Sequence, residues 1–177
     1  MVVRAVIAVV IGVVMATAVP APASAKVPKP PKPCKVLLPA DLETIFEQPW
    51  SKGKQQLGGP CVLGRPAGAE VPNIVVSLII EQKASTRQAK KAFARGKVAT
   101  EDIVQQVEPV RALGDEGYIT TIIGADVLSF RLGRDLVELR ADRVDDPEAT
   151  YRDQVLAAGA IVEARLLPPP KPKRRGG

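Results

Sequence analysis

The chain has 177 residues, with 25 lysines and arginines against 19 aspartates and glutamates, two cysteines and no histidine. This length fits one ordinary domain with appendages. The lack of histidine excludes catalytic pairs of serine or cysteine with histidine, and it excludes histidine-ligated metal and haem sites. We therefore expect neither a metal nor a cofactor, and we assign no catalytic residue.

The N-terminus is typical of a secretory signal peptide, predicted over residues 1–25. Arg4 precedes an uncharged, mostly apolar run over residues 5–19, and Ala23-Ser24-Ala25 supplies small residues for cleavage. The alternative is a retained membrane anchor, for which the run is shorter than the roughly 20 residues of a spanning helix. We expect a secreted, extracellular protein, with association with the cell wall left open.

Basic residues gather at both ends of the mature chain. Residues 26–33 form a Pro/Lys linker, and residues 168–177 form a basic Pro-rich tail, whereas residues 34–167 hold all 19 acidic residues and form a single nearly neutral domain. Pro-Lys segments cannot form helix or bury apolar area, so both should be extended and solvated. The tail cations, expected to contact anionic polymers or lipid headgroups, are Lys171, Lys173, Arg174 and Arg175. Two alternatives remain: the tails are solvated linkers, or they are the active part and the domain is a spacer.

Cys34 and Cys61 are the two thiols of the chain. In an exported protein this pair is best interpreted as one disulfide. Closing such a loop stabilises the fold by about 3.5 kcal/mol in the chain-entropy model. A free thiol or a redox pair is the alternative, although no C-x-x-C spacing is present.

The first half of the domain alternates helix and strand signals. Pro39 opens a helix through Gln48, a strand begins at Cys61, and residues 73–81 form the clearest strand. Ser85 is a plausible cap for a helix that ends at Gly96.

The second half is mostly strand. After a short helical turn capped near Thr100, three apolar runs follow over residues 118–123, 127–132 and 136–141, separated by Gly/Asp turns that favour antiparallel hairpins. Asp146-Pro147 opens a last helix with an apolar stripe from Tyr151 to Leu166. We predict an α+β fold: an antiparallel sheet of about five strands with helices packed on it, and one disulfide.

Two short motifs carry a family resemblance. Cys34-Lys35-Val36-Leu37-Leu38 follows the Pro-rich linker, and the segment Leu113 to Tyr118 reads L-G-D-E-G-Y. With these motifs, residues 34–167 resemble actinobacterial secreted proteins and lipoproteins of unknown function that begin with Cys and a Leu-Leu pair. The resemblance implies a compact α+β domain of the PsbP type and supplies no catalytic residues. Lys32-Pro33 before Cys34 departs from a lipidation site, so we expect no lipid anchor.

Trp50 is the candidate ligand-binding residue. It lies between a proline and a Gly/Lys loop, and it could line a cleft with Lys52 and Lys54 at the rim. The alternative is that Trp50 covers the disulfide and closes the core.

Other candidates for chemistry have ordinary explanations. Asp115-Glu116 could serve acid-base catalysis or bind a cation, but a structural turn is favoured. Asp142, Asp145 and Asp146 could bind calcium, but a helix-capping role for Asp146 is the favoured explanation. Lys83 with Ser77 or Ser85 could form a Ser-Lys catalytic dyad, but ordinary roles are favoured, with Ser77 in a strand and Ser85 at a helix start.

We therefore expect a non-enzymatic envelope or extracellular module that binds a partner protein, a lipid or a glycan. The alternative is a carboxylate-dependent hydrolase acting on envelope polymers, which should show two acids on separate elements together with aromatic side chains. We expect a monomer and no nucleic-acid partner.

Overall fold

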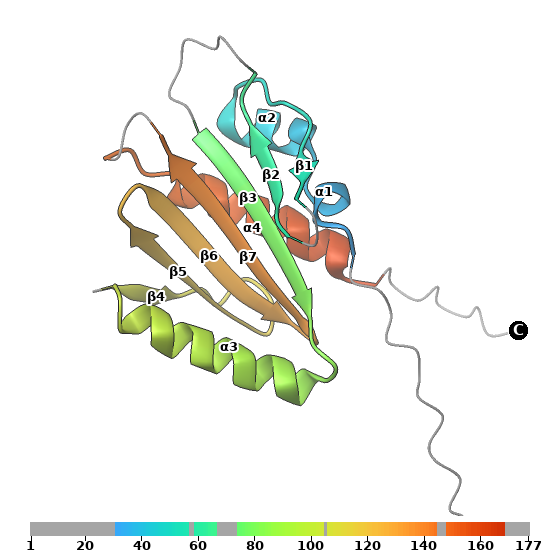
Figure 1. The fold of residues 1–177 in the computed structure, drawn as a ribbon, viewed down its shortest axis with the longest axis vertical. Helices are drawn as coiled ribbons and strands as arrows, with labels where there is room; N and C mark the ends of the chain where they lie inside the picture. The colour runs from blue at the N-terminus through green and yellow to red at the C-terminus, as the bar shows by residue number, and fades with distance from the viewer. Residues whose placement is uncertain (1–30, 57–58, 67–73, 105, 145–147, 169–177) are drawn as a thin grey trace, which may run out of the picture.

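The computed structural model describes residues 31–56, 59–66, 74–104, 106–144 and 148–168. Within these residues the chain is α+β, with four helices and a seven-stranded antiparallel sheet in the order β1-β2-β3-β7-β6-β5-β4 (Figure 1). The helices are α1 (Pro33–Val36), α2 (Pro39–Phe46), α3 (Thr86–Glu101) and α4 (Arg152–Leu166). The strands are β1 (Lys54–Gln55), β2 (Cys61–Gly64), β3 (Ile74–Gln82), β4 (Val107–Pro109), β5 (Glu116–Ile122), β6 (Ala125–Leu132) and β7 (Asp135–Arg143).

The predicted class is confirmed, but the expected number of about five strands is wrong. The additional strands β1 and β4 lie at the two edges of the sheet, where they pair with β2 and β5. They have two and three residues, too few to show an alternating apolar pattern. Pro109 is tolerated in β4 because an edge strand needs hydrogen bonds on one side alone.

One face of the sheet carries the main core. Alternate residues of β3 and β7 are buried there, with Leu78 opposite Leu139 and Val76 opposite Ala141. Helix α4 packs on β6 and β7, and α2 packs on α4. The predicted apolar stripe of α4 is confirmed, because Val155, Ala158 and Val162 are buried.

The other face is covered in part by α3, which packs on β6 and β7 (Figure 1). Two residues of α3, Ala89 and Phe93, are buried. Strand β6 lies between the two helical layers and is therefore buried on both faces, including the polar side chains of Ser129 and Arg131.

Several predicted helix boundaries are corrected. Helix α3 continues past Gly96 to Glu101, and the Thr100 hydroxyl donates to the Gly96 carbonyl at 2.9 Å, so Thr100 does not cap a separate turn. Helix α4 begins at Arg152, and the proposed cap Asp146-Pro147 lies outside the described residues. The Ser85 cap is confirmed, since its hydroxyl accepts from the Gln88 amide at 3.2 Å.

The disulfide between Cys34 and Cys61 is present and joins α1 to β2. Gly53 lies against it, because a Cβ at this position would be 2.7 Å from the Cys61 sulfur. This bond is compatible with an exported protein. No helix in the described ranges is both long and apolar enough to cross a membrane.

Predictions for the chain ends lie outside the described residues. These are the signal peptide over residues 1–25, most of the linker over 26–33, and the tail cations Lys171, Lys173, Arg174 and Arg175.

Candidate functional site

The candidate site is a cleft between α3 and the sheet. It consists of two adjoining hollows of about 340 and 210 Å³, and both are lined by Tyr118, Ser129 and Glu138. We refer to the two hollows together as the α3 cleft. The three shared residues come from the neighbouring strands β5, β6 and β7, so the cleft runs across the sheet beneath one edge of the helix.

Small residues on α3 leave room for this cleft. Ala92 and Gly96 lie four residues apart and line the first hollow, and a Cβ at Gly96 would have no heavy atom within 4 Å. Phe93 holds the helix above the sheet, because its ring packs against Tyr118 with centroids 5.4 Å apart. The Tyr118 hydroxyl lies 3.3 Å from that of Thr100, which fixes the ring from the other side.

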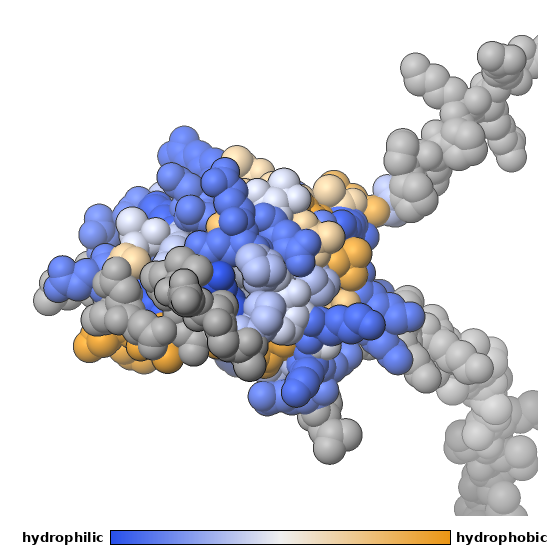
Figure 2. Space-filling view, turned by 90° about the horizontal axis from the view of Figure 1, so that it is seen from above, coloured by the Kyte–Doolittle hydropathy of each residue, from blue (hydrophilic) through white to orange (hydrophobic). Residues whose placement is uncertain are grey.

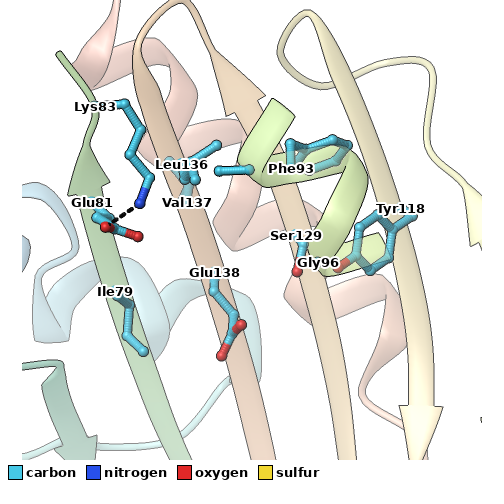
Figure 3. A pocket seen from close by; sticks show the side chains of 11 residues that line it. Ile79, Glu81, Lys83, Phe93, Gly96, Tyr118, Ser129, Leu136, Val137 and Glu138 are labelled. Atoms are coloured by element: carbon cyan, nitrogen blue, oxygen red, sulfur yellow. Dashed lines mark hydrogen bonds and ion pairs between the residues drawn. The ribbon is translucent and has the colours of Figure 1, made fainter. Parts of the chain in front are cut away.

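The polar side chains of the first hollow differ in whether they have a hydrogen-bond or ion-pair partner (Figure 3). Glu81 forms an ion pair with Lys83 at the end of β3. Glu138 is exposed and takes part in no hydrogen bond or ion pair with another described residue. The Ser129 side chain is 8% exposed, and its hydroxyl has no hydrogen-bond partner among the described residues either. Both groups are available to a ligand.

The rest of the lining is mainly apolar. Ile79 is 38% exposed beside Glu138, its partner across strands β3 and β7, and Leu136 lies two residues from Glu138 on β7. Ile103, at the other end of the cleft, is 83% exposed. A concave, mostly apolar surface with a few unsatisfied polar groups is the usual character of a ligand site.

Outside the α3 cleft, exposed apolar side chains of the described residues lie in small patches. Figure 2 shows a largely polar face with apolar atoms gathered toward the edges of the molecule. Among the described residues, Ile123 in the β5–β6 turn is fully exposed and Val144 after β7 is 56% exposed. The Arg143 amide donates to the Gly124 carbonyl, so these two side chains extend from neighbouring backbone segments.

Asp115 lies in a bend and Glu116 is the first residue of β5, so the turn expected from the sequence ends at Asp115. Arg131 donates from Nη1 to Asp115 at 2.7 Å and from Nε to Glu116 at 2.5 Å, and Asp115 also accepts from the Gly133 amide. A carboxylate pair held by one buried guanidinium is not free for acid-base work. Gly114, at φ 64°, lets the chain pass close to the Arg131 carbonyl.

Other acidic side chains also have structural partners. Asp126 is fully buried and accepts from the Thr121 hydroxyl at 2.6 Å and from the Tyr151 amide at 2.8 Å. Asp41 accepts two hydrogen bonds from Arg165, at 2.5 and 2.8 Å. These hydrogen bonds hold the pKa of the Asp41 carboxyl below its usual value, and they raise the pKa of Arg165.

Trp50 lies in the core and is 5% exposed, with its ring 5.1 Å from that of Phe46. Lys52 is exposed on the segment that leads to β1, and Lys54 is exposed as the first residue of β1. The structure therefore places the predicted Trp–Lys site away from the α3 cleft. A binding role for the two lysines stays a prediction.

The remaining candidates are separated. Asp142 pairs with Arg140, whereas Asp145 and Asp146 lie outside the described residues. Ser77 faces Arg140 across strands β3 and β7, Ser85 caps α3, and Lys83 pairs with Glu81. Among the described residues, no group of three or more histidine, cysteine, aspartate or glutamate side chains could hold a metal ion.

Sequence reasoning missed Glu81, Glu138 and the aromatic pair of Phe93 and Tyr118. Glu138 alternates with the buried Val137 and Leu139 on β7, a signal that it faces away from the main core. The sequence did not reveal the strand order, in which β7 lies between β3 and β6. It therefore did not indicate that these residues lie close together.

No protein-family model, curated protein or solved structure matches this chain. The geometry of the α3 cleft is therefore the main support for a function.

Proposed function

We propose that the protein is an exported, non-enzymatic binding module that takes its ligand in the α3 cleft. The observation that carries the proposal is the pair of adjoining hollows that share Tyr118, Ser129 and Glu138. The shared side chains supply an aromatic ring, a hydroxyl and an unpaired carboxylate. A partner protein, a lipid or a glycan of the envelope remains the expected ligand class.

The exposure of the cleft acids favours binding over hydrolysis. The Glu81 side chain is 59% exposed and paired with Lys83, and Glu138 is exposed. In a carboxylate-dependent hydrolase, the acid must hold its proton at neutral pH, which is achieved by an apolar, buried setting. Neither cleft glutamate has that setting.

A hydrolase acting on envelope polymers is the second candidate function. One observation favours it: Glu81 on β3 and Glu138 on β7 are two acids on separate strands that line a cleft with Phe93 and Tyr118. This is the arrangement expected of a carboxylate enzyme that acts on a sugar.

The two basic segments are proposed to add electrostatic attachment to anionic polymers or lipid headgroups. The short helix α1 lies beside the end of α4, because the two helices pack together and Arg165 donates to the Val36 carbonyl at 2.7 Å (Figure 1). The linker and the tail therefore leave the domain at neighbouring points, and their seven cations can act together. Such binding should weaken steeply as salt screens the charges.

The test fills the cleft without disturbing the fold. Gly96→Leu projects a side chain into open space in the cleft, and it should not destabilise α3 because glycine is a poor helix former. Ala94→Leu adds the same side chain at an exposed position of the same helix. Binding of glycan fragments, anionic lipid vesicles and Pro-rich peptides is measured for the mature protein and both variants.

The proposal predicts that one probe class binds the mature protein and Ala94→Leu with the same Kd, while Gly96→Leu binds at least tenfold more weakly. Equal binding by all three proteins, or no binding of any probe, contradicts it. Release of sugar from the glycan fragments, abolished by both Glu81→Gln and Glu138→Gln, would instead establish the hydrolase.

A further inference from the structure

We infer, on the basis of the binding role proposed for the α3 cleft, that the cleft is occupied in the absence of other ligands by the chain's own C-terminal segment, residues 169–177. This segment is the last part of the basic Pro-rich tail and reads PPKPKRRGG. Three independent properties support the assignment: where the described chain ends, how far the segment reaches, and how its chemistry fits the lining.

The described chain ends beside the cleft. Pro168 lines a hollow together with Gln82 and Asp135, the last pair of the β3–β7 ladder. The next pair in this ladder is Glu81 with Leu136, and both of these residues line the α3 cleft. Thr86, the first residue of α3, also lines the hollow at Pro168. The tail therefore starts at the end of the sheet where the cleft opens.

The segment is long enough to enter. A Pro-rich chain in the polyproline II conformation rises about 3.1 Å per residue, so nine residues span about 28 Å. Lys171 and Lys173 then lie about 9 and 15 Å beyond Pro168. Along β7, Glu138 is three residues from Asp135, a distance of about 10 Å. Lys173 can therefore reach Glu138, and Lys171 can reach Glu81, which lies one residue pair from the end of the ladder.

The chemistry of the segment matches the lining. Pro-rich segments bind grooves with aromatic walls, because their backbone is already extended and loses little entropy on binding. In the α3 cleft, Ile79 supplies the more exposed apolar surface at 38%, and the rings of Phe93 and Tyr118 line the cleft at 8% and 5% exposure. Glu138 carries a carboxylate with no partner among the described residues, so a tail cation would gain an ion pair there without breaking one.

Carbodiimide cross-linking of the mature protein tests this directly, because it joins an amine to a carboxylate that it contacts. The Glu81–Lys83 ion pair serves as the internal positive control. Glu47, exposed at the end of α2, serves as the comparison acid. Cross-links from Lys171 and Lys173 are identified by peptide mass spectrometry of the monomer band, at low and high salt.

We expect at least tenfold more cross-linking of these lysines to Glu138 and Glu81 than to Glu47, with a yield that is independent of protein concentration and falls at high salt. Gly96→Leu should reduce this yield, and Ala94→Leu should not. Equal cross-linking to Glu47, no cross-link from either lysine while the control pair reacts, or cross-links confined to dimers would overturn the inference. If the inference fails while Gly96→Leu still weakens probe binding, the cleft remains the binding site and the tail is not its occupant.

Discussion

Replacing Asp126 by asparagine removes a negative charge from the interior of the domain. The Asp126 side chain is fully buried, and its carboxylate lies 3.6 Å from a nitrogen of Arg143, whose side chain is 4% exposed. It also accepts from the Thr121 hydroxyl and the Tyr151 amide, which links β5, β6 and the start of α4. The asparagine amide preserves the size of the side chain, but its NH2 group cannot accept, so the substitution removes the charge and one of the two accepted hydrogen bonds.

Removing one partner of a buried ion pair typically costs about 3–5 kcal/mol, because the remaining charge stays buried. For a domain of this size, 1 kcal/mol corresponds to roughly 3 °C, so Tm should fall by roughly 10 °C or more. The assay is thermal unfolding of the mature protein followed by circular dichroism.

Asp142→Asn is the matched control. Asp142 pairs with Arg140, but both side chains are about one-third exposed, so the loss should be below about 1 kcal/mol. Asp126→Asn melting at the same temperature as Asp142→Asn would refute the reasoning.

Three further predictions concern stability. Cys34→Ser should lower the free energy of unfolding by about 3.5 kcal/mol and Tm by roughly 10 °C, and an unchanged melting curve would show that the bond does not form in solution. Gly114→Ala should cost about 2 kcal/mol or more, because its Cβ would lie 2.4 Å from the Arg131 carbonyl oxygen. Gly133→Ala is the control: it is also at positive φ but has open space, and it should cost about 1 kcal/mol. Equal losses of stability for the two variants in urea unfolding would contradict the predicted clash. Because the folded pKa of Asp41 is lowered, its stabilisation is present above the unfolded pKa and is lost as pH falls through the folded pKa. In acid unfolding, the Asp41→Asn variant should therefore lose less stability below about pH 4 than the parent protein does. The difference should be less than about 1 kcal/mol.

The strands that could be predicted are those with a strong local pattern. Strand β3 and the three hairpin strands have long apolar runs separated by Gly/Asp turns, and Gly124 and Gly133 indeed have positive φ. Strands β1 and β4 could not be predicted, since they depend on pairing with a neighbour. Helix α3 passes through Gly96 because one glycine costs about 1 kcal/mol, which is too little to end a helix of 16 residues.

The α3 cleft was beyond sequence reasoning for a related reason. Its residues come from β3, α3, β5, β6 and β7, and their proximity depends on the order of strands in the sheet. Trp50, a rare residue beside a Gly/Lys loop, drew attention to another surface, although its ring is needed in the core beside Phe46. The most conspicuous sequence features mark the disulfide and the turns, whereas the cleft is built from ordinary strand and helix residues.

The central claim is that the α3 cleft is the ligand-binding surface. The most direct measurement is a map of backbone amide chemical shifts for the mature protein, titrated in turn with glycan fragments, anionic vesicles and Pro-rich peptides. We predict that the probe that binds shifts the amides of Gly96, Tyr118, Ser129 and Glu138 together, and that Gly96→Leu abolishes the response. Shifts confined to residues 50–54, or to residues 171–175, would contradict the claim and place binding at the Trp–Lys segment or in the tail.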